Sequence, residues 1–251
     1  NEKVVLAYID EGYSPAYSLI VKVGTVSGTS ISFGSATTLD AASAVSSTFD
    51  SSNNKVVLVF AASNGDCSAS GCAIVGTVSG TSISFGSVVE FDDGGGIYTG
   101  AATFDSNSNK VVIAFDDQDD ENKGMAIVGT VSGTSISFGS ATTFNSGTTK
   151  DIATTFDTTN NKVVIAYQDD GNSDYGTAIV GTVSGTSISF GTAVVFESAG
   201  CNEVRVSYDH NSSVNKCAVV YQDRGNSNHG TCAVGTVSGT SISFGTPVVF
   251  N

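Results

Sequence analysis

An eleven-residue segment, GTVSGTSISFG, occurs five times in this chain without a single change and constrains the fold more than any other feature. The copies occupy residues 24–34, 76–86, 129–139, 181–191 and 235–245. Their starts are 52, 53, 52 and 54 residues apart, which indicates five copies of one supersecondary unit. A unit of this length cannot bury both of its faces alone. The sequence therefore predicts one domain of five units packed side by side.

The complete unit contains four apolar runs, which we name strands a to d. In the fourth unit they occupy residues 151–157, 162–169, 176–185 and 186–196. β-Branched and aromatic residues dominate these runs, and turn residues separate them, as is typical of strands. Strand b is almost continuously apolar, which predicts a strand covered on both faces. Strand d alternates Ile188 and Phe190 with serines, so it is expected to be the half-exposed outer strand.

The turns of the unit also repeat. Ser27 and Gly28, like their equivalents, are expected to form a two-residue hairpin turn between strands c and d, in which glycine adopts a positive φ. An aspartate ends strand a before a run of Ser, Thr and Asn, and an Asx-type cap of the a–b turn is its expected role. These aspartates are Asp50, Asp105, Asp157 and Asp209.

Four-stranded antiparallel units repeated about every 50 residues predict an all-β fold, a five-bladed β-propeller. A solenoid is the alternative, although its repeats are usually shorter. Strand a occurs only four times, so we expect the chain to be part of a longer polypeptide that supplies the missing strand or further blades. The expected blades are approximately residues 1–40, 41–92, 93–145, 146–197 and 198–251.

The net charge of −14 disfavours nucleic acid and anionic lipid as partners. No run of about 18 apolar residues is present, so no membrane span is expected. The five cysteines favour an extracellular or surface-displayed protein. Cys67 and Cys72 flank a short loop and could form a local disulfide, Cys201 and Cys232 could form a second one, and Cys217 is expected to be a buried thiol.

The predicted blade has one constant and one variable face. The a–b and c–d turns lie on the first face, and the b–c loops and d–a connections, which differ among the copies, lie on the second. A constant scaffold with one variable face is typical of a binding protein. Aromatic rings and polar groups on the variable face suit a neutral glycan. The candidate ligand-binding residues are Tyr13, Tyr17, Tyr98, Asp169, Asn172, Tyr175, Asp223, Asn226 and His229.

An aspartate follows strand b in four units and is replaced by Ala62 in the second. The four are Asp10, Asp117, Asp169 and Asp223. Recurrence at an equivalent position predicts a role in each blade, either structural or in ligand binding. A glycoside hydrolase would instead need carboxylates in unlike roles. We therefore expect no enzyme, with a glycoside hydrolase as the remaining catalytic alternative.

Two further hypotheses concern cations and assembly. The loop DDQDDEN, residues 116–122, could bind Ca²⁺ through Asp117, Asp119 and Glu121, or could simply be a solvated acidic loop. No other cofactor is expected. The exposed side of strand d carries Ser and Thr without the Lys or Pro that usually protects an edge, so self-association of a structural repeat module is an alternative function.

The units, such as KVVIAYQDDGNSDYGTAIVGTVSGTSISFG at residues 162–191, resemble the tandem propeller repeats of extracellular microbial and viral surface proteins. The five-blade count resembles lectin propellers of the tachylectin type. The resemblance covers the whole chain at the level of architecture, and it implies glycan recognition or surface adhesion. The leading hypothesis is a non-catalytic, lectin-like adhesin that binds a glycan or cell-surface receptor through its b–c and d–a loops.

Overall fold

A computed structural model describes residues 3–12, 17–62, 67, 70–92, 96–209 and 214–251, and in these residues the fold is all-β, with two short 3₁₀ helices. Unit 1 contains β1 (Lys3–Asp10), β2 (Ser18–Ser27), β3 (Ser30–Phe33) and the first part of β4 (Thr37–Asp50). Unit 2 contains the rest of β4, β5 (Lys55–Ala62), β6 (Gly71–Ser79), β7 (Ser82–Phe85) and β8 (Val89–Glu90).

The remaining three units repeat this order. Unit 3 contains β9 (Gly100–Asp105), β10 (Lys110–Asp117), β11 (Lys123–Ser132), β12 (Ser135–Phe138) and the first part of β13 (Thr142–Asp157). Unit 4 contains the rest of β13, β14 (Lys162–Asp169), η1 (Asp170–Asn172), β15 (Tyr175–Ser184), β16 (Ser187–Phe190) and β17 (Val194–Glu197). Unit 5 contains β18 (Cys201–Tyr208), β19 (Cys217–Asp223), η2 (Arg224–Asn226), β20 (His229–Ser238), β21 (Ser241–Phe244) and β22 (Val248–Val249).

The strands pair antiparallel in the expected order a, b, c and d in units 2 to 5, and unit 1 begins at strand b. Strand d differs from the prediction because it is divided into two pieces that pair with different halves of strand c. In unit 4, β16 pairs with residues 181–184 and β17 with residues 176–178. In units 1 and 3 the second piece continues directly into strand a of the next unit, so β4 and β13 each run through two units. The expected boundaries at 40/41 and 145/146 fall inside these two strands.

A glycine lies where strand d is divided. In four of the five copies, any larger side chain at this position would clash with the next unit. A Cβ atom at Gly191 would overlap the carbonyl oxygen of Thr240, in the c–d turn of the next unit. Gly34, Gly86 and Gly139 meet the equivalent threonine in the same way. The repeated glycine therefore permits the close approach of one unit to the next.

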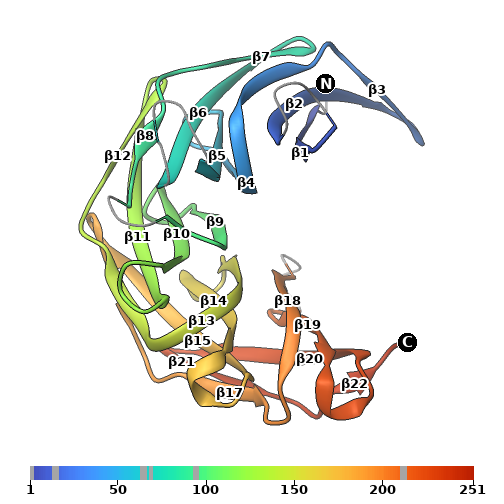
Figure 1. Ribbon diagram of the computed structural model, residues 1–251, viewed down its shortest axis with the longest axis vertical. Helices are drawn as coiled ribbons and strands as arrows, with labels where there is room; N and C mark the ends of the chain where they lie inside the picture. The colour runs from blue at the N-terminus through green and yellow to red at the C-terminus, as the bar shows by residue number, and fades with distance from the viewer. Residues whose placement is uncertain (1–2, 13–16, 63–66, 68–69, 93–95, 210–213) are drawn as a thin grey trace.

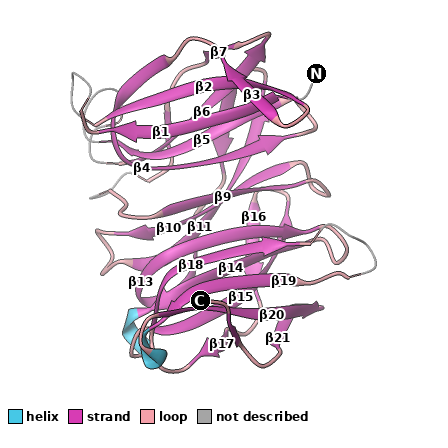
Figure 2. Cartoon of the chain, turned by 90° about the vertical axis from the view of Figure 1, so that its right-hand side faces the viewer, coloured by secondary structure: helices cyan, strands magenta, loops and turns pink. Residues whose placement is uncertain are grey.

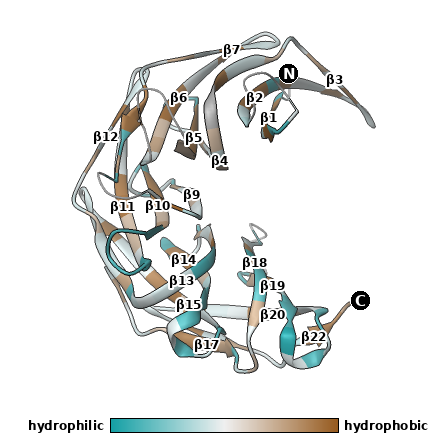
Figure 3. Ribbon diagram, viewed as in Figure 1, coloured by the Kyte–Doolittle hydropathy of each residue, from teal (hydrophilic) through white to brown (hydrophobic). Residues whose placement is uncertain are grey.

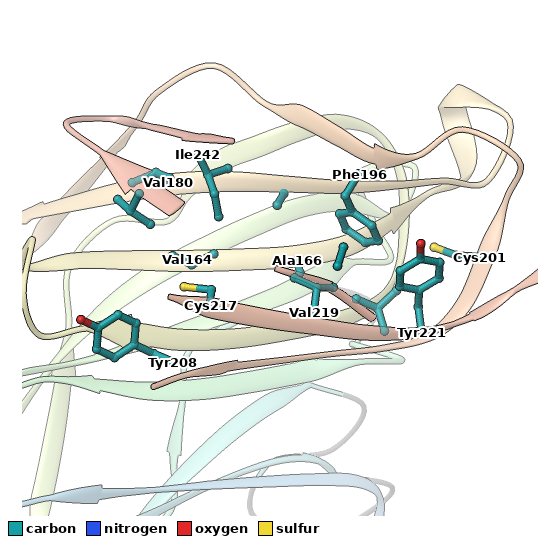
Figure 4. Close-up of a cluster of buried hydrophobic side chains, with 14 residues drawn as sticks. Val164, Ala166, Val180, Phe196, Cys201, Tyr208, Cys217, Val219, Tyr221 and Ile242 are labelled. Atoms are coloured by element: carbon teal, nitrogen blue, oxygen red, sulfur yellow. The ribbon is translucent and has the colours of Figure 1, made fainter. Parts of the chain in front are cut away.

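Four hydrophobic clusters form the core, and each joins two successive units. Figure 4 shows the cluster between units 4 and 5, where Val164, Ala166 and Val180 face Val219 and Tyr221. As predicted, strand b is buried on both faces in β5, β10 and β14. Figure 3 shows β5 and β10 in hydrophobic colours and the loop between β10 and β11 in hydrophilic ones.

The five units follow one another around an open arc (Figure 1). Successive units contact each other through their inner strands β4, β9, β13 and β18, but no comparable contact joins β1 to β18 in the described residues. The described residues therefore form an open arc and do not show a closed ring of five blades. Val4 and Leu6 on the outer face of β1 are consequently exposed, and strand b of the first and last units is covered less completely than in units 2 to 4.

The predicted division into two faces is confirmed by the strand register. Asp157 pairs with Lys162 where strands a and b meet at one edge, while Asp169 pairs with Tyr175 at the opposite edge, where the b–c loop begins. In the side view of Figure 2, the 3₁₀ helices of the b–c loops lie together at one edge. Within the described part of the chain, the structure has no helix long and apolar enough to cross a bilayer.

The two predicted turns are also present. Asp157 accepts hydrogen bonds from the backbone N–H groups of Thr159 and Asn160, both at 2.9 Å, which confirms the Asx-type cap. Asp50 and Asp105 cap their turns in the same way. The c–d turn is displaced by one residue from the prediction: Ser27 pairs with Ser30, so the central residues are 28 and 29, and Gly28 has a φ of 58°.

One of the two predicted disulfides is present. Cys67 and Cys72 are bonded, and Cys217 is a buried thiol as expected. The second predicted bridge was wrong, because Cys201 and Cys232 are both free. Cys201 pairs in register with Asp223, and Cys232 pairs with Val220, so the two thiols lie on opposite faces of the unit 5 sheet.

Candidate functional site

A pocket of about 320 Å³ lies between units 3 and 4 on the variable face. Unit 3 contributes the segment before β9, the end of β10 and its b–c loop, and unit 4 contributes the middle of β13 and the end of β14. The pocket is lined by Tyr98, Thr99, Asp116, Asn122, Thr148, Thr149, Lys150, Asp151 and Gln168. We refer to it as the 3/4 pocket.

Asp116, at the end of β10, is the most deeply buried carboxylate of the 3/4 pocket, with 1% of its surface exposed. The backbone N–H groups of Tyr98 and Thr99 donate to Oδ1 at 3.0 and 2.6 Å, and the Thr99 hydroxyl donates to the same oxygen at 3.2 Å. Burial nevertheless dominates and raises the pKa of Asp116 from 3.8 to about 6, although these hydrogen bonds lower it. The pocket therefore contains a buried carboxyl group whose pKa, at about 6, lies well above its ordinary value.

The opposite wall is an irregular part of β13. The register with β14 shifts between Lys150 and Ala153, and Asp151 adopts a positive φ of 49°. The Asp151 carboxylate accepts a hydrogen bond from the backbone N–H of Glu203 in unit 5, at 2.8 Å. The backbone N–H of Thr149 donates to the carbonyl oxygen of Asn122 at 2.9 Å, which ties this wall to the b–c loop of unit 3.

A second network supports the end of the pocket formed by β14. The side-chain amide of Gln168, itself buried, donates to Oδ1 of Asp174 at 2.9 Å. Oδ2 of Asp174 forms an ion pair with Arg224 of unit 5 at 2.6 Å. Lys150 pairs with Asp170 at 3.0 Å, but both side chains are partly exposed, so this pair contributes at most about 1 kcal/mol.

Tyr98 is the aromatic residue of the 3/4 pocket, and 70% of its surface is exposed. Its backbone is fixed by Asp116, while its neighbour Ile97 is buried in the core. An exposed ring on a fixed backbone provides a flat apolar surface beside hydrogen-bond donors and acceptors. This combination can bind a neutral ligand that has an apolar face and several hydroxyl groups.

The structure places the predicted ligand-binding residues that it describes on the variable face but does not gather them into one site. Tyr98 lines the 3/4 pocket, whereas Tyr17 is exposed at the start of strand c in unit 1. Tyr13 lies outside the described residues. The others lie on the b–c loops and the adjoining strand ends of units 4 and 5: Asp169, Asn172 and Tyr175, then Asp223, Asn226 and His229.

The aspartate that follows strand b accepts a hydrogen bond in all four of its occurrences. Asp169 accepts one from the side-chain amide of Asn145 at 3.1 Å, and the other three accept them from their own b–c loops. Asp10 accepts a hydrogen bond from the backbone N–H of Gly12 at 3.0 Å, and Asp117 does so from Asp119 at 3.1 Å. Asp223 accepts one from Asn226 at 3.1 Å and caps η2. These three carboxylates hold their own b–c loops in shape.

The acidic loop of unit 3 shows no preformed cation site. Asp117 is occupied by backbone amides of its own loop, and Lys123 forms an ion pair with Asp120 at 2.6 Å. In the part of the chain that the structure describes, no three His, Cys, Asp or Glu residues form a group that could hold a metal ion. Calcium binding through Asp117, Asp119 and Glu121 stays a prediction.

Sequence reasoning missed most of the 3/4 pocket, including Asp116. A comparison of the five copies would have identified this residue, because the position holds Ile9, Ala61, Gln168 and Gln222 in the other units. The prediction concentrated instead on the following position, where aspartate recurs. A charge that occurs in only one copy was the more informative signal.

Comparisons with known proteins support the fold. No protein-family model and no curated protein matches this chain. Among solved structures, the chain is similar to a mutant of the Aleuria aurantia lectin in complex with α-methyl-L-fucoside. The TM-score is 0.58 at 13% sequence identity, and the match covers 98% of this chain and 78% of the lectin chain. The likeness shows that this chain has the all-β fold of a lectin of known structure.

Proposed function

We propose that this chain is a non-catalytic, lectin-like module that binds a neutral glycan in the 3/4 pocket. In this proposal the five units are blades of a β-propeller, and the ligand binds between two of them. The observation that carries the proposal is the exposed ring of Tyr98 beside the buried carboxyl group of Asp116, in a pocket of about 320 Å³. The similarity to a lectin solved with α-methyl-L-fucoside gives further support.

The chemistry of the pocket fits a sugar. The ring of Tyr98 can contact the apolar face of a pyranose, while Asn122, Thr148 and Gln168 offer polar groups to hydroxyls. A carboxyl group in a shielded pocket accepts hydrogen bonds more strongly than one in water. The net charge of −14 favours neutral over anionic glycans.

A glycan-array screen of the purified chain tests this proposal, with α-methyl-L-fucoside as a soluble competitor. We expect saturable binding that Tyr98→Ala weakens at least about ten-fold, because the stacking surface is lost. Tyr17→Ala is the matched control, since Tyr17 is 51% exposed on the same face but does not line the 3/4 pocket. A blank array, or equal losses in both variants, would reject the 3/4 pocket as a glycan site.

The wider role follows from the same proposal. A glycan-binding module of this kind would act as an adhesin or receptor-binding domain in an extracellular or surface-displayed protein. The proposal also states that the chain does not cleave the glycans that it binds. Incubating these glycans with the chain tests this point. Release of a free sugar would support the glycoside hydrolase alternative instead.

A further inference from the structure

A second cavity, of about 340 Å³, lies among the inner strands of four units. Its walls come from β4, β9, β13 and β18, and the first, second and last of these border the open middle of the arc in Figure 1. Many of its lining residues are small: Ala44, Gly100, Ala101, Ala102 and Ala153. These small side chains leave room between the strands, and we refer to this space as the central cavity.

The central cavity and the 3/4 pocket share part of their walls. Tyr98, Thr99 and Asp151 line both spaces. The two cavities therefore meet along an edge formed by these three residues. A ligand bound in the 3/4 pocket could extend across this edge without leaving the protein surface.

One polar group in the central cavity lacks a partner. Thr154 lines this cavity but not the 3/4 pocket, and its buried hydroxyl oxygen makes no hydrogen bond within the described residues. A buried hydroxyl without a partner is costly, and such groups usually bind water or a ligand. Thr154 therefore carries an unused hydroxyl group at the wall of the central cavity, which a change of its rotamer would present to a ligand there.

We propose that the ligand is a neutral oligosaccharide of at least two sugars, with one sugar in the 3/4 pocket and the next in the central cavity. This inference rests on the proposed glycan-binding function and adds the length of the ligand. Two adjoining cavities of similar volume suit a ligand made of similar units joined in a chain. The shared edge contacts the linkage between them, and Thr154 binds a hydroxyl of the second sugar.

The test is an array printed with neutral mono-, di-, tri- and tetrasaccharides of hexoses, deoxyhexoses and N-acetylhexosamines, followed by titration of the strongest binder and its terminal monosaccharide. We expect the monosaccharide to bind at least about ten-fold more weakly than the disaccharide. Thr154→Val removes one hydrogen bond and should weaken disaccharide binding about five-fold, while monosaccharide binding is unchanged. Thr154→Leu adds bulk and should remove most of the advantage of the longer ligand.

Thr182→Val is the matched control, because the Thr182 hydroxyl also lacks a partner but lies on β15, outside both cavities. It should leave the affinity for every glycan unchanged. Equal affinity for monosaccharide and disaccharide would overturn the length inference alone. The same conclusion would follow if both Thr154 variants kept the wild-type melting temperature and still bound the disaccharide as much more tightly than the monosaccharide as the wild type does. Binding of no printed glycan would overturn both this inference and the proposed function.

Discussion

The fourth and fifth copies of GTVSGTSISFG have identical sequences but different surroundings. In the fourth copy Gly191 lies against the backbone of Thr240, and Val180, just before the copy, is fully buried. In the fifth copy the nearest atom to a Cβ at Gly245 would be 3.9 Å away, and Val234 is 47% exposed. The difference arises because unit 5 covers unit 4, whereas among the described residues no unit covers the outer face of unit 5.

This comparison separates two kinds of constraint on a repeated residue. Some residues are required by the unit itself, such as the turn glycine with its positive φ. Others are required only by the contact with a neighbouring unit, such as Gly191 and Val180. Substitutions at equivalent positions of the two copies measure each kind directly.

The largest effect is expected for Gly191→Ala. The new Cβ would overlap a backbone oxygen, so one of the two units must shift, at a cost of about 3 kcal/mol or more. Gly245→Ala, whose new Cβ would make only an ordinary contact at 3.9 Å, should change the free energy of unfolding by less than about 0.5 kcal/mol. Urea denaturation of both variants measures the difference. Similar losses in the two variants would show that the interface between units 4 and 5 is not the reason for this glycine.

The next effect concerns a position that differs between copies, Asp116 in unit 3 and Gln168 in unit 4. The pKa of Asp116 in the folded protein, about 6, is above its ordinary value of 3.8, so between these pH values the folded state keeps a proton that the unfolded state has lost. Asp116 therefore lowers the stability as the pH rises from about 4 to about 7, by up to about 3 kcal/mol. Asp116→Asn should not show this loss.

Urea denaturation of the wild type and Asp116→Asn across this pH range provides the measurement. We expect the difference in the free energy of unfolding to change in favour of the variant as the pH rises. Asp117→Asn is the neighbouring control, because Asp117 lies outside the 3/4 pocket. Parallel pH profiles for the wild type and Asp116→Asn would contradict the raised pKa of Asp116.

A smaller effect is expected at the valine that precedes each copy, Val180 before the fourth and Val234 before the fifth. Val180→Ala removes two buried methyl groups from the cluster between units 4 and 5 and should cost about 2 kcal/mol. Val234→Ala should cost less than about 0.5 kcal/mol, since this side chain is already half exposed. The melting temperatures of the two variants test the comparison. An equal loss at Val234 would mean that the outer face of unit 5 is covered in solution.

The smallest effect should be the same in both copies. Gly185 and Gly239 have φ angles of 62° and 60° and no atom near an added Cβ. Alanine at either position should therefore cost about 1 kcal/mol through backbone strain alone. Thermal unfolding of Gly185→Ala and Gly239→Ala should give equal shifts. Unequal shifts would show that the turn also depends on the neighbouring unit.

Much of the fold could be predicted because the repeat presents each local signal several times. The burial of strand b, the exposure of strand d and the aspartate caps all follow from patterns within one unit. The candidate site was predicted far less well. The variable face and Tyr98 were identified, but the 3/4 pocket requires Asp116 and Asp151, which are 35 positions apart and come from different units.

The sequence by itself determined the unit: five copies, a four-stranded pattern that is complete in four of them, the order of pairing and the division into a constant and a variable face. These properties depend on alternation, turn residues and spacing, which act over a few residues. Only the tertiary structure decided how the units meet: the open arc, the steric role of Gly191, the free thiols on opposite faces of unit 5 and the cavities between units. Contacts between units depend on distances across the chain, and identical sequences cannot specify surroundings that differ.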